Sequence, residues 1–155
     1  MNNDKKWMTL AIKQALKSET EGEVPVGAVL IKDEQLIAKA HNQPISTNDA
    51  TAHAEIQLLR VAGKHQKNYR LIDTTIYVTL EPCVMCFGAM MHARIARIVF
   101  GASDPKTGVC GSRADLTTES FFNHEMEISG GVLEKECKEL LQSFFKSRRK
   151  DNLNV

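Results

Sequence analysis

Segments with strand patterns alternate with segments of helical periodicity along most of this chain, and that alternation constrains its fold more than any other feature. Runs of β-branched and apolar residues predict strands over 24–32, 35–41, 74–80 and 96–102. Apolar residues spaced three and four apart predict helices over 8–16, 54–63, 83–95 and 133–145. This interleaving predicts a three-layer α/β domain, whose sheet opens with a hairpin at Asp33-Glu34 and continues through crossovers.

Length and charge limit what such a domain does. A chain of 155 residues that is 43% hydrophobic has enough apolar side chains for one core, which predicts a single domain over 1–155. Its 20 basic and 19 acidic residues leave a formal charge of +1, so any contact with nucleic acid must come from a local patch. The strongest patch is the basic end of the closing helix, "FFKSRRK", at about 144–150.

The N-terminal segment and the cysteine content indicate in which cellular compartment the protein is expected. No apolar run approaches the roughly 20 residues that span a bilayer, and the charged start, with Asp4, Lys5 and Lys6, lacks a secretory core. We therefore expect a cytoplasmic protein without a membrane segment. In a reducing compartment, the Cys83-x-x-Cys86 pair indicates metal or redox chemistry rather than a disulfide framework.

Three potential metal ligands lie at the starts of two predicted helices. His53 precedes one helix, and Cys83 and Cys86 begin another, so both helix N-termini could face one point. A catalytic zinc ion typically takes three such nitrogen and sulfur ligands and keeps its fourth position for water. Neither Cys110 nor Cys137 has a neighbouring ligand at metal spacing, so we expect no fourth protein ligand.

Glu55 stands two residues after His53, where a carboxylate can reach the fourth position and move protons without acting as a ligand. The combined pattern, His53-x-Glu55 followed by Pro82-Cys83-x-x-Cys86, is the signature of zinc-dependent nucleobase deaminases. Its two halves are each common by chance, but together they are specific.

Longer segments carry a closer resemblance, which runs from about Glu23 to Arg149 and is densest in "EVPVGAVL", "TAHAEI", "NYRLIDTTIYVTLEPCVMC" and "DPKTG". In these segments the chain resembles the bacterial tRNA-specific adenosine deaminases of the cytidine deaminase-like superfamily. The resemblance implies an α/β/α fold with a central mixed sheet of about five strands. It also implies hydrolysis of the wobble adenosine in the anticodon loop of an arginine tRNA to inosine, by a homodimer with one Zn²⁺ per subunit.

The same resemblance implies substrate contacts. Val26 and Asn42 match the residues that enclose and contact the base. The positions that match contacts to flanking nucleotides are Arg70, Asp104, Lys106, Asn123, Phe144, Phe145, Arg148 and Arg149. The chain departs from the usual pattern at Ala50, at Phe87 and at Arg113-Ala114, and none of these changes removes a ligand or the glutamate.

Several of these residues have plainer interpretations. Asn42 and Asp104 are also typical turn residues, and one of Phe144 and Phe145 is expected to belong to the core. The basic cluster also suits a solvated helix end that complements the helix dipole.

Three other functions stay open from the sequence. One is a deaminase of a free base, nucleoside or nucleotide such as cytidine, deoxycytidylate or guanine. A second is a non-catalytic RNA-binding module stabilised by zinc. The third is a thiol oxidoreductase that uses Cys83 and Cys86.

Overall fold

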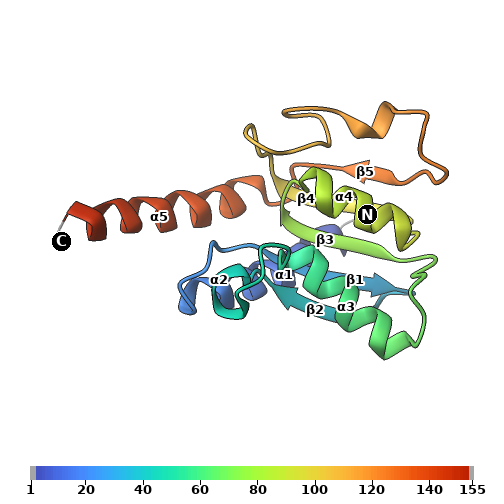
Figure 1. Cartoon of the computed structure of the whole chain (residues 1–155), viewed down its shortest axis with the longest axis horizontal. Helices are drawn as coiled ribbons and strands as arrows, with labels where there is room; N and C mark the ends of the chain where they lie inside the picture. Colours follow the sequence, from blue (N-terminus) through green and yellow to red (C-terminus); the bar gives the residue numbers. More distant parts are fainter. Residues whose placement is uncertain (1–2, 154–155) are drawn as a thin grey trace.

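The computed structural model describes residues 3–153, and their strands form one mixed five-stranded sheet in the order β2-β1-β3-β4-β5 (Figure 1). The strands are β1 (Gly27–Lys32), β2 (Gln35–His41), β3 (Thr75–Leu80), β4 (Arg97–Ala102) and β5 (Glu127–Ser129). The helices are α1 (Asn3–Thr20), α2 (Pro44–Thr47), α3 (Ala54–Gln66), α4 (Val84–His92) and α5 (Glu134–Leu153), with a short 3₁₀ turn at Leu116–Thr118. Residues 1–2 and 154–155 of the expected domain lie outside the described residues.

The first two strands form the expected hairpin. Asp33 and Glu34 both have positive φ, 50° and 59°, which is the geometry of a two-residue hairpin turn that follows the twist of the strands. Strand β1 begins at Gly27 rather than at residue 24, because Pro25 has no N–H to donate to a neighbouring strand.

The other half of the sheet is parallel. Strand β3 pairs antiparallel with β1 but parallel with β4, and α4 makes the crossover between β3 and β4. Strand β5 pairs parallel with β4 and closes the far edge of the sheet. The sequence did not reveal β5, because it has only three residues and one apolar side chain among them.

Helices cover both faces of the sheet, as the three-layer prediction required. Helices α3 and α4 pack on one face, where Leu58 and Phe87 are fully buried against strand residues such as Ile76. Helix α1 packs on the other face through Met8 and its neighbours (Figure 1). The backbone of α1 lies so close to β1 that a Cβ at Gly27 would overlap the carbonyl oxygen of Ala11.

Helices α1 and α5 extend beyond the predicted ranges, to Asn3–Thr20 and Glu134–Leu153, and two other predicted helix ends are wrong. Helix α3 continues through Gly63 to Gln66, where Lys67 adopts a left-handed conformation and the N–H of Asn68 caps the Gly63 carbonyl. The glycine is thus inside the last turn instead of after it. Helix α4 ends at His92, because Arg94 is left-handed, with φ of 63°, and turns the chain toward β4.

The closing helix α5 leaves the body of the molecule. Its first turns lie on the α1 side of the sheet, where Cys137 is buried, and the rest extends away from the strands (Figure 1). The predicted apolar stripe is therefore only partly buried: Phe144 is enclosed, whereas Phe145 is 46% exposed. Within residues 3–153, none of the helices combines the length and apolarity needed to cross a bilayer.

Candidate active site

The three predicted ligands meet beyond the end of β3, between the N-termini of α3 and α4. His53 is the N-cap residue of α3 and Cys83 is the N-cap residue of α4, while Cys86 lies in the first turn of α4. Neither side chain makes a capping hydrogen bond, so both can point at a shared ligand. The two helix dipoles favour negative charge between them, which suits thiolates.

The spacing of the three side chains fits a tetrahedral zinc ion. The Nδ1 atom of His53 lies 3.6 Å from Sγ of Cys83 and 3.5 Å from Sγ of Cys86. Zinc–sulfur bonds of about 2.3 Å and zinc–nitrogen bonds of about 2.0–2.1 Å at a tetrahedral angle put nitrogen and sulfur about 3.6 Å apart. Within residues 3–153, these three residues are the one group of three such side chains close enough to share an ion.

The protonation of the two thiols also fits a cation. A hydrogen bond from Cys86, opposed by burial and reinforced by the bond with His53, lowers the pKa of Cys83 to about 4. The hydrogen bond with Cys83, together with burial, raises the pKa of Cys86. Cysteine binds zinc as the thiolate, so the lowered pKa of Cys83 favours the ligand form of this residue.

Glu55 lies beside these ligands without joining them. It is only 4% exposed, in the first turn of α3. Burial raises the pKa of Glu55 to about 7, and the charge of the neighbouring Cys83 adds to the effect. A carboxyl group with a pKa near neutrality both accepts and returns a proton readily, which is what general acid–base catalysis requires.

His53, Glu55 and Cys83 line a cavity of about 270 Å³. Three residues predicted to contact substrate, Val26, Asn42 and Asp104, line the same cavity. The rest of its lining consists of Val24, Pro44, Leu80, Glu81 and Thr107. The structure thus brings the ligands, the buried acid and three of the ten predicted substrate contacts into one site.

Two of these contacts have defined internal hydrogen bonds. The side-chain amide of Asn42 donates to the carbonyl of Val24 at 3.2 Å, so its orientation in the cavity is held. The carboxylate of Asp104 accepts from the backbone N–H groups of Lys106 and Thr107 and from the Thr107 hydroxyl. Asp104 therefore organises its own turn, as the plainer interpretation of this residue expects.

Two buried glutamates that the sequence analysis missed hold the walls of this cavity. Glu23, 1% exposed, accepts from the N–H groups of Ile45 at 3.0 Å and Ser46 at 2.7 Å. Burial opposes ionisation of Glu23, but the hydrogen bonds from Ser46 and Ile45 outweigh it and hold its pKa below the ordinary value. Glu23 thereby anchors the turn that carries Pro44.

Glu81, 2% exposed, anchors the loop on the opposite wall of the cavity through hydrogen bonds of the same kind. It accepts from the backbone N–H groups of Asp104 at 3.0 Å, Cys110 at 2.9 Å and Ser112 at 3.2 Å, and from the Ser112 hydroxyl. A Cβ at Gly108 would overlap this carboxylate, so the loop approaches it closely. The sequence signal was an acidic residue at the end of an apolar strand, directly before Pro82.

The other predicted contacts lie outside the cavity. Arg70 lies near Lys32 and Thr74, where β3 begins, whereas the metal ligands lie where β3 ends. Lys106 is exposed beside the cavity wall, and on α5 Arg148 stacks over Phe144 at 5.0 Å and donates to the carbonyl of Gly22. Phe145 and Arg149 are exposed on the same helix.

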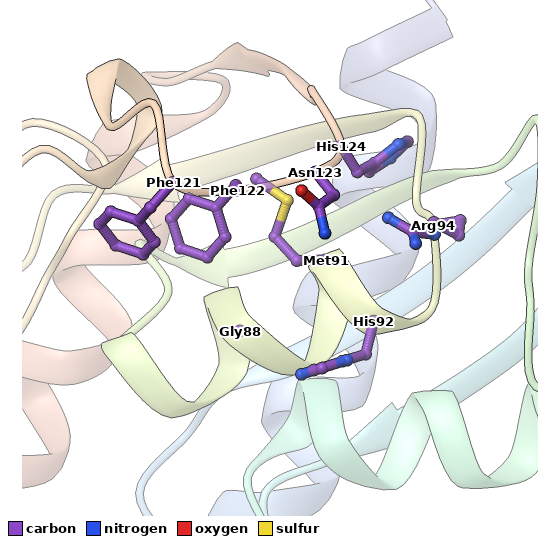
Figure 2. Close-up of a pocket in the computed structure, with 8 residues that line it drawn as sticks. All are labelled: Gly88, Met91, His92, Arg94, Phe121, Phe122, Asn123 and His124. Carbon is purple, nitrogen blue, oxygen red and sulfur yellow. The ribbon is translucent and has the colours of Figure 1, made fainter.

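Asn123 lines a separate pocket of about 290 Å³ at the end of α4 (Figure 2). Figure 2 shows its side chain next to Met91 and Phe122, with His92 farther away, below α4 in this view. The ring of Phe122 packs edge-on against Phe87 with centroids 5.5 Å apart. Phe87, one of the positions that depart from the usual family pattern, thus supports the wall of this pocket. The motif match predicted that Asn123 contacts substrate, but it did not predict that the residue lies in a pocket separate from the cavity of Glu55.

Comparisons with known proteins identify the family. Residues 1–102 match the sequence profile of the cytidine and deoxycytidylate deaminase zinc-binding region. A tRNA-specific adenosine deaminase of Haemophilus influenzae is 50% identical over 149 residues, which cover 96% of this chain and 86% of the relative. The chain belongs to the tRNA-specific adenosine deaminase family. The profile is that of a zinc-binding region, and the cluster of His53, Cys83 and Cys86 within it is consistent with one zinc ion per chain.

Solved structures agree with this family and its fold. A structure from a study of A-to-I editing by tRNA:A34 deaminases at the wobble position superposes with a TM-score of 0.83 and 38% identity, covering 88% of this chain and 99% of the other. A guanine deaminase from Bacillus subtilis is 36% identical with a TM-score of 0.60, over 63% of each chain. The tRNA-specific adenosine deaminase family thus has the predicted cytidine deaminase-like architecture.

Proposed function

We propose that this protein is a zinc-dependent hydrolase that converts the wobble adenosine of an arginine tRNA to inosine. The observation that carries the proposal is the buried Glu55 carboxyl beside the His53, Cys83 and Cys86 cluster, at a cavity of about 270 Å³. A space near the lower end of the range for small-ligand pockets suits one base that is unstacked from its neighbours.

The chemistry assigned to the chain is proton transfer at Glu55. Zinc, when bound, supplies the Lewis acidity that makes water a nucleophile near neutral pH. Glu55 accepts the proton of the attacking water at a carboxylate oxygen. It then returns protons to the purine ring and to the departing amine, so that a C–O bond replaces the C–N bond at C6 and ammonia leaves.

Asn42 and Val26 are assigned to the base. The bond from the Asn42 amide to the Val24 carbonyl uses one N–H and leaves the side-chain oxygen and the second N–H for a purine edge. Val26, only 8% exposed, supplies an apolar wall on the same side. The base is thereby held by shape and by one fixed amide.

A tRNA loop suits this site better than the alternatives. An adenosine stacked in a helix cannot reach a buried carboxyl, whereas loop bases can be splayed out. We assign contacts with flanking nucleotides to Asp104 and Lys106 at the cavity wall and to Phe144, Phe145, Arg148 and Arg149 on α5. A free-base deaminase is the second candidate, supported by the likeness to a guanine deaminase over 63% of the chain.

We also propose that the protein acts as a homodimer of single domains, 1–155, in the cytoplasm. A groove between α3 and α4 supports this, because Ile56, Leu59 and Ala89 line it beside Tyr69, a residue of the loop after α3 that is 71% exposed. Arg70 and Asn123, remote from the cavity of their own chain, are assigned to more distant parts of the tRNA. Sedimentation equilibrium tests the dimer directly.

The deciding experiment incubates the purified protein with arginine tRNA and sequences the wobble position. Inosine at that position, absent with Glu55→Ala, is the expected result. Release of ammonia from free adenine, guanine or cytidine at comparable kcat/KM, without inosine in the tRNA, would favour the second candidate.

A further inference from the structure

A groove of about 440 Å³ runs along the edge of the sheet, on the opposite side of β2 from β1. Helices α1 and α3 lie on opposite faces of the sheet, and both contribute to the groove, with β2 between them (Figure 1). Four cationic side chains line it: Lys17, Lys39, Arg60 and Lys64. None of these residues belongs to the cavity that holds Glu55.

Three of the four cationic side chains that line this groove have no acidic partner within residues 3–153. Among the ion pairs of residues 3–153, Arg60 contacts Asp49 at 3.3 Å, but none involves Lys17, Lys39 or Lys64. All three lysines are exposed. The whole chain has 20 basic and 19 acidic residues, so a groove with three free ammonium groups is a local concentration of charge. Like charges that share a groove repel each other unless an anion lies between them.

One turn separates the groove from the active site. Asn42 and Pro44 line the cavity, whereas Gln43, between them, lines the groove. The side chain of Gln43 accepts a hydrogen bond from Gln57 of α3 at 3.3 Å, which holds it on the groove side. A chain that leaves the cavity over this turn therefore meets the cationic groove next.

We infer that this groove binds the phosphodiester backbone of the RNA beside the target nucleotide. The inference rests on the proposed function, because it takes the substrate to be RNA rather than a free base. Lysine ammonium groups contact phosphate as flexible point charges, and they need no buried partner to do so. Each contact releases counterions from the RNA, which makes the binding dependent on salt.

Protection of the sheet edge is the competing explanation. A lysine on an edge strand discourages pairing with another chain, and Lys39 on β2 fits that role. It leaves Lys17 and Lys64 unexplained, because both project from helices. The two explanations differ in what happens to RNA affinity when the charges are removed.

The test compares two triple variants that remove the same charge. Lys17→Gln/Lys39→Gln/Lys64→Gln removes the three lysines of the groove, and Lys5→Gln/Lys6→Gln/Lys13→Gln removes three exposed lysines of α1 that do not line it. Binding of an arginine tRNA anticodon stem-loop is measured at several salt concentrations. The log–log salt slope of the groove variant should fall by about 0.7 for each phosphate released, about 2 in all, while the control keeps the parent slope. kcat at saturating RNA should stay within a few-fold of the parent in both.

Equal salt slopes for the two variants would overturn the inference, and increased aggregation of the groove variant with parent-like RNA binding would assign the lysines to edge protection. If the groove variant is unstable, Lys64→Gln alone, on the exposed surface of α3, should still lower the slope by about 0.7. The parent protein is assayed for inosine in the same experiment. Absence of inosine with the parent counts against the proposed function, whereas inosine with an unchanged slope in the groove variant counts against the groove alone.

Discussion

The cavity and the closing helix α5 are both assigned to the RNA, but they are built in different ways. Side chains from α2, α3, β3 and several connecting loops converge on the cavity, and Glu23, Glu55 and Glu81, in or beside it, are all nearly inaccessible to solvent. Helix α5 projects from the molecule. After its first turns, Phe144 is the one buried residue among those of the helix that the structure describes. A preorganised cavity stabilises a transition state, whereas an exposed basic helix adds affinity.

The largest expected effect is on the metal site. Cys86→Ala removes one of three ligands, and the remaining His53 and Cys83 do not complete a tetrahedral ion. We expect zinc content and inosine formation to be lost together. Metal analysis under reducing conditions, beside the activity assay, checks this. Full zinc occupancy in Cys86→Ala would mean that another residue is the ligand.

Changing Glu55 should separate metal binding from chemistry. Glu55→Ala should keep zinc and RNA affinity but lower kcat by about 10²–10⁴, the usual range for an acid–base group. Glu55→Gln, which keeps the size of the side chain but cannot take up a proton, is the matched control for cavity shape. Activity within a few-fold of the parent in either variant would remove Glu55 from the proton path.

Glu81 tests whether the walls of the cavity must be held. In the parent, backbone N–H groups of the loop donate to the Glu81 carboxylate. Glu81→Gln places an amide NH₂, which cannot accept, against some of these N–H groups. Leaving buried donors without acceptors costs about 1–3 kcal/mol, so kcat/KM should fall by about 10–100-fold, mainly through KM. Glu119→Gln, an exposed change in the connection between β4 and β5 that Glu81 holds, is the control. Zinc content should be unchanged. A KM like that of the parent would mean that the loop after β4 keeps its conformation without the hydrogen bonds to Glu81.

Removing residues 146–155 should affect binding only. We expect KM for tRNA to rise about tenfold and the log–log salt slope to fall by about 0.7 for each phosphate that the helix no longer binds, with kcat at saturating tRNA close to that of the parent. The competing role, a cationic end that complements the helix dipole, predicts a small loss of thermal stability and identical binding curves. Titrations of the anticodon stem-loop at several salt concentrations distinguish the two.

The metal centre could be predicted from sequence because its chemistry requires particular residues at particular spacings. The spacing of His53, Cys83 and Cys86 predicts three ligands at two helix starts, and the structure places them there. The hairpin and the buried strands were predictable for a similar reason, since a continuous run of β-branched and apolar residues and a turn such as Asp33-Glu34 are local properties.

The parts that sequence reasoning missed depend on contacts between distant segments. Strand β5 forms only because β4 offers it a parallel partner, and its three residues carry no pattern of their own. Glu23 and Glu81 gain their roles from backbone N–H groups more than 20 positions away in the chain. The end of α3 was misplaced because Gly63, a typical stop signal, is capped by the following residues instead of ending the helix.

The smallest expected effects come from two neighbouring rings on α5, which share a sequence pattern but not an environment. Phe144 is 8% exposed under the guanidinium of Arg148, and Phe145 is 46% exposed. Burying a phenylalanine contributes about 1.5–3 kcal/mol, so Phe144→Ala should lower the melting temperature by several degrees.

Phe145→Ala should leave the melting temperature unchanged, because its ring packs only loosely against the rest of the protein. If Phe145 stacks on a base, its removal should weaken RNA binding by about fivefold, near the lower end of the range for base stacking. Thermal melts and RNA titrations on both variants form a two-by-two comparison. The opposite outcome, with stability reduced at Phe145 and affinity reduced only at Phe144, would exchange the two roles on this helix.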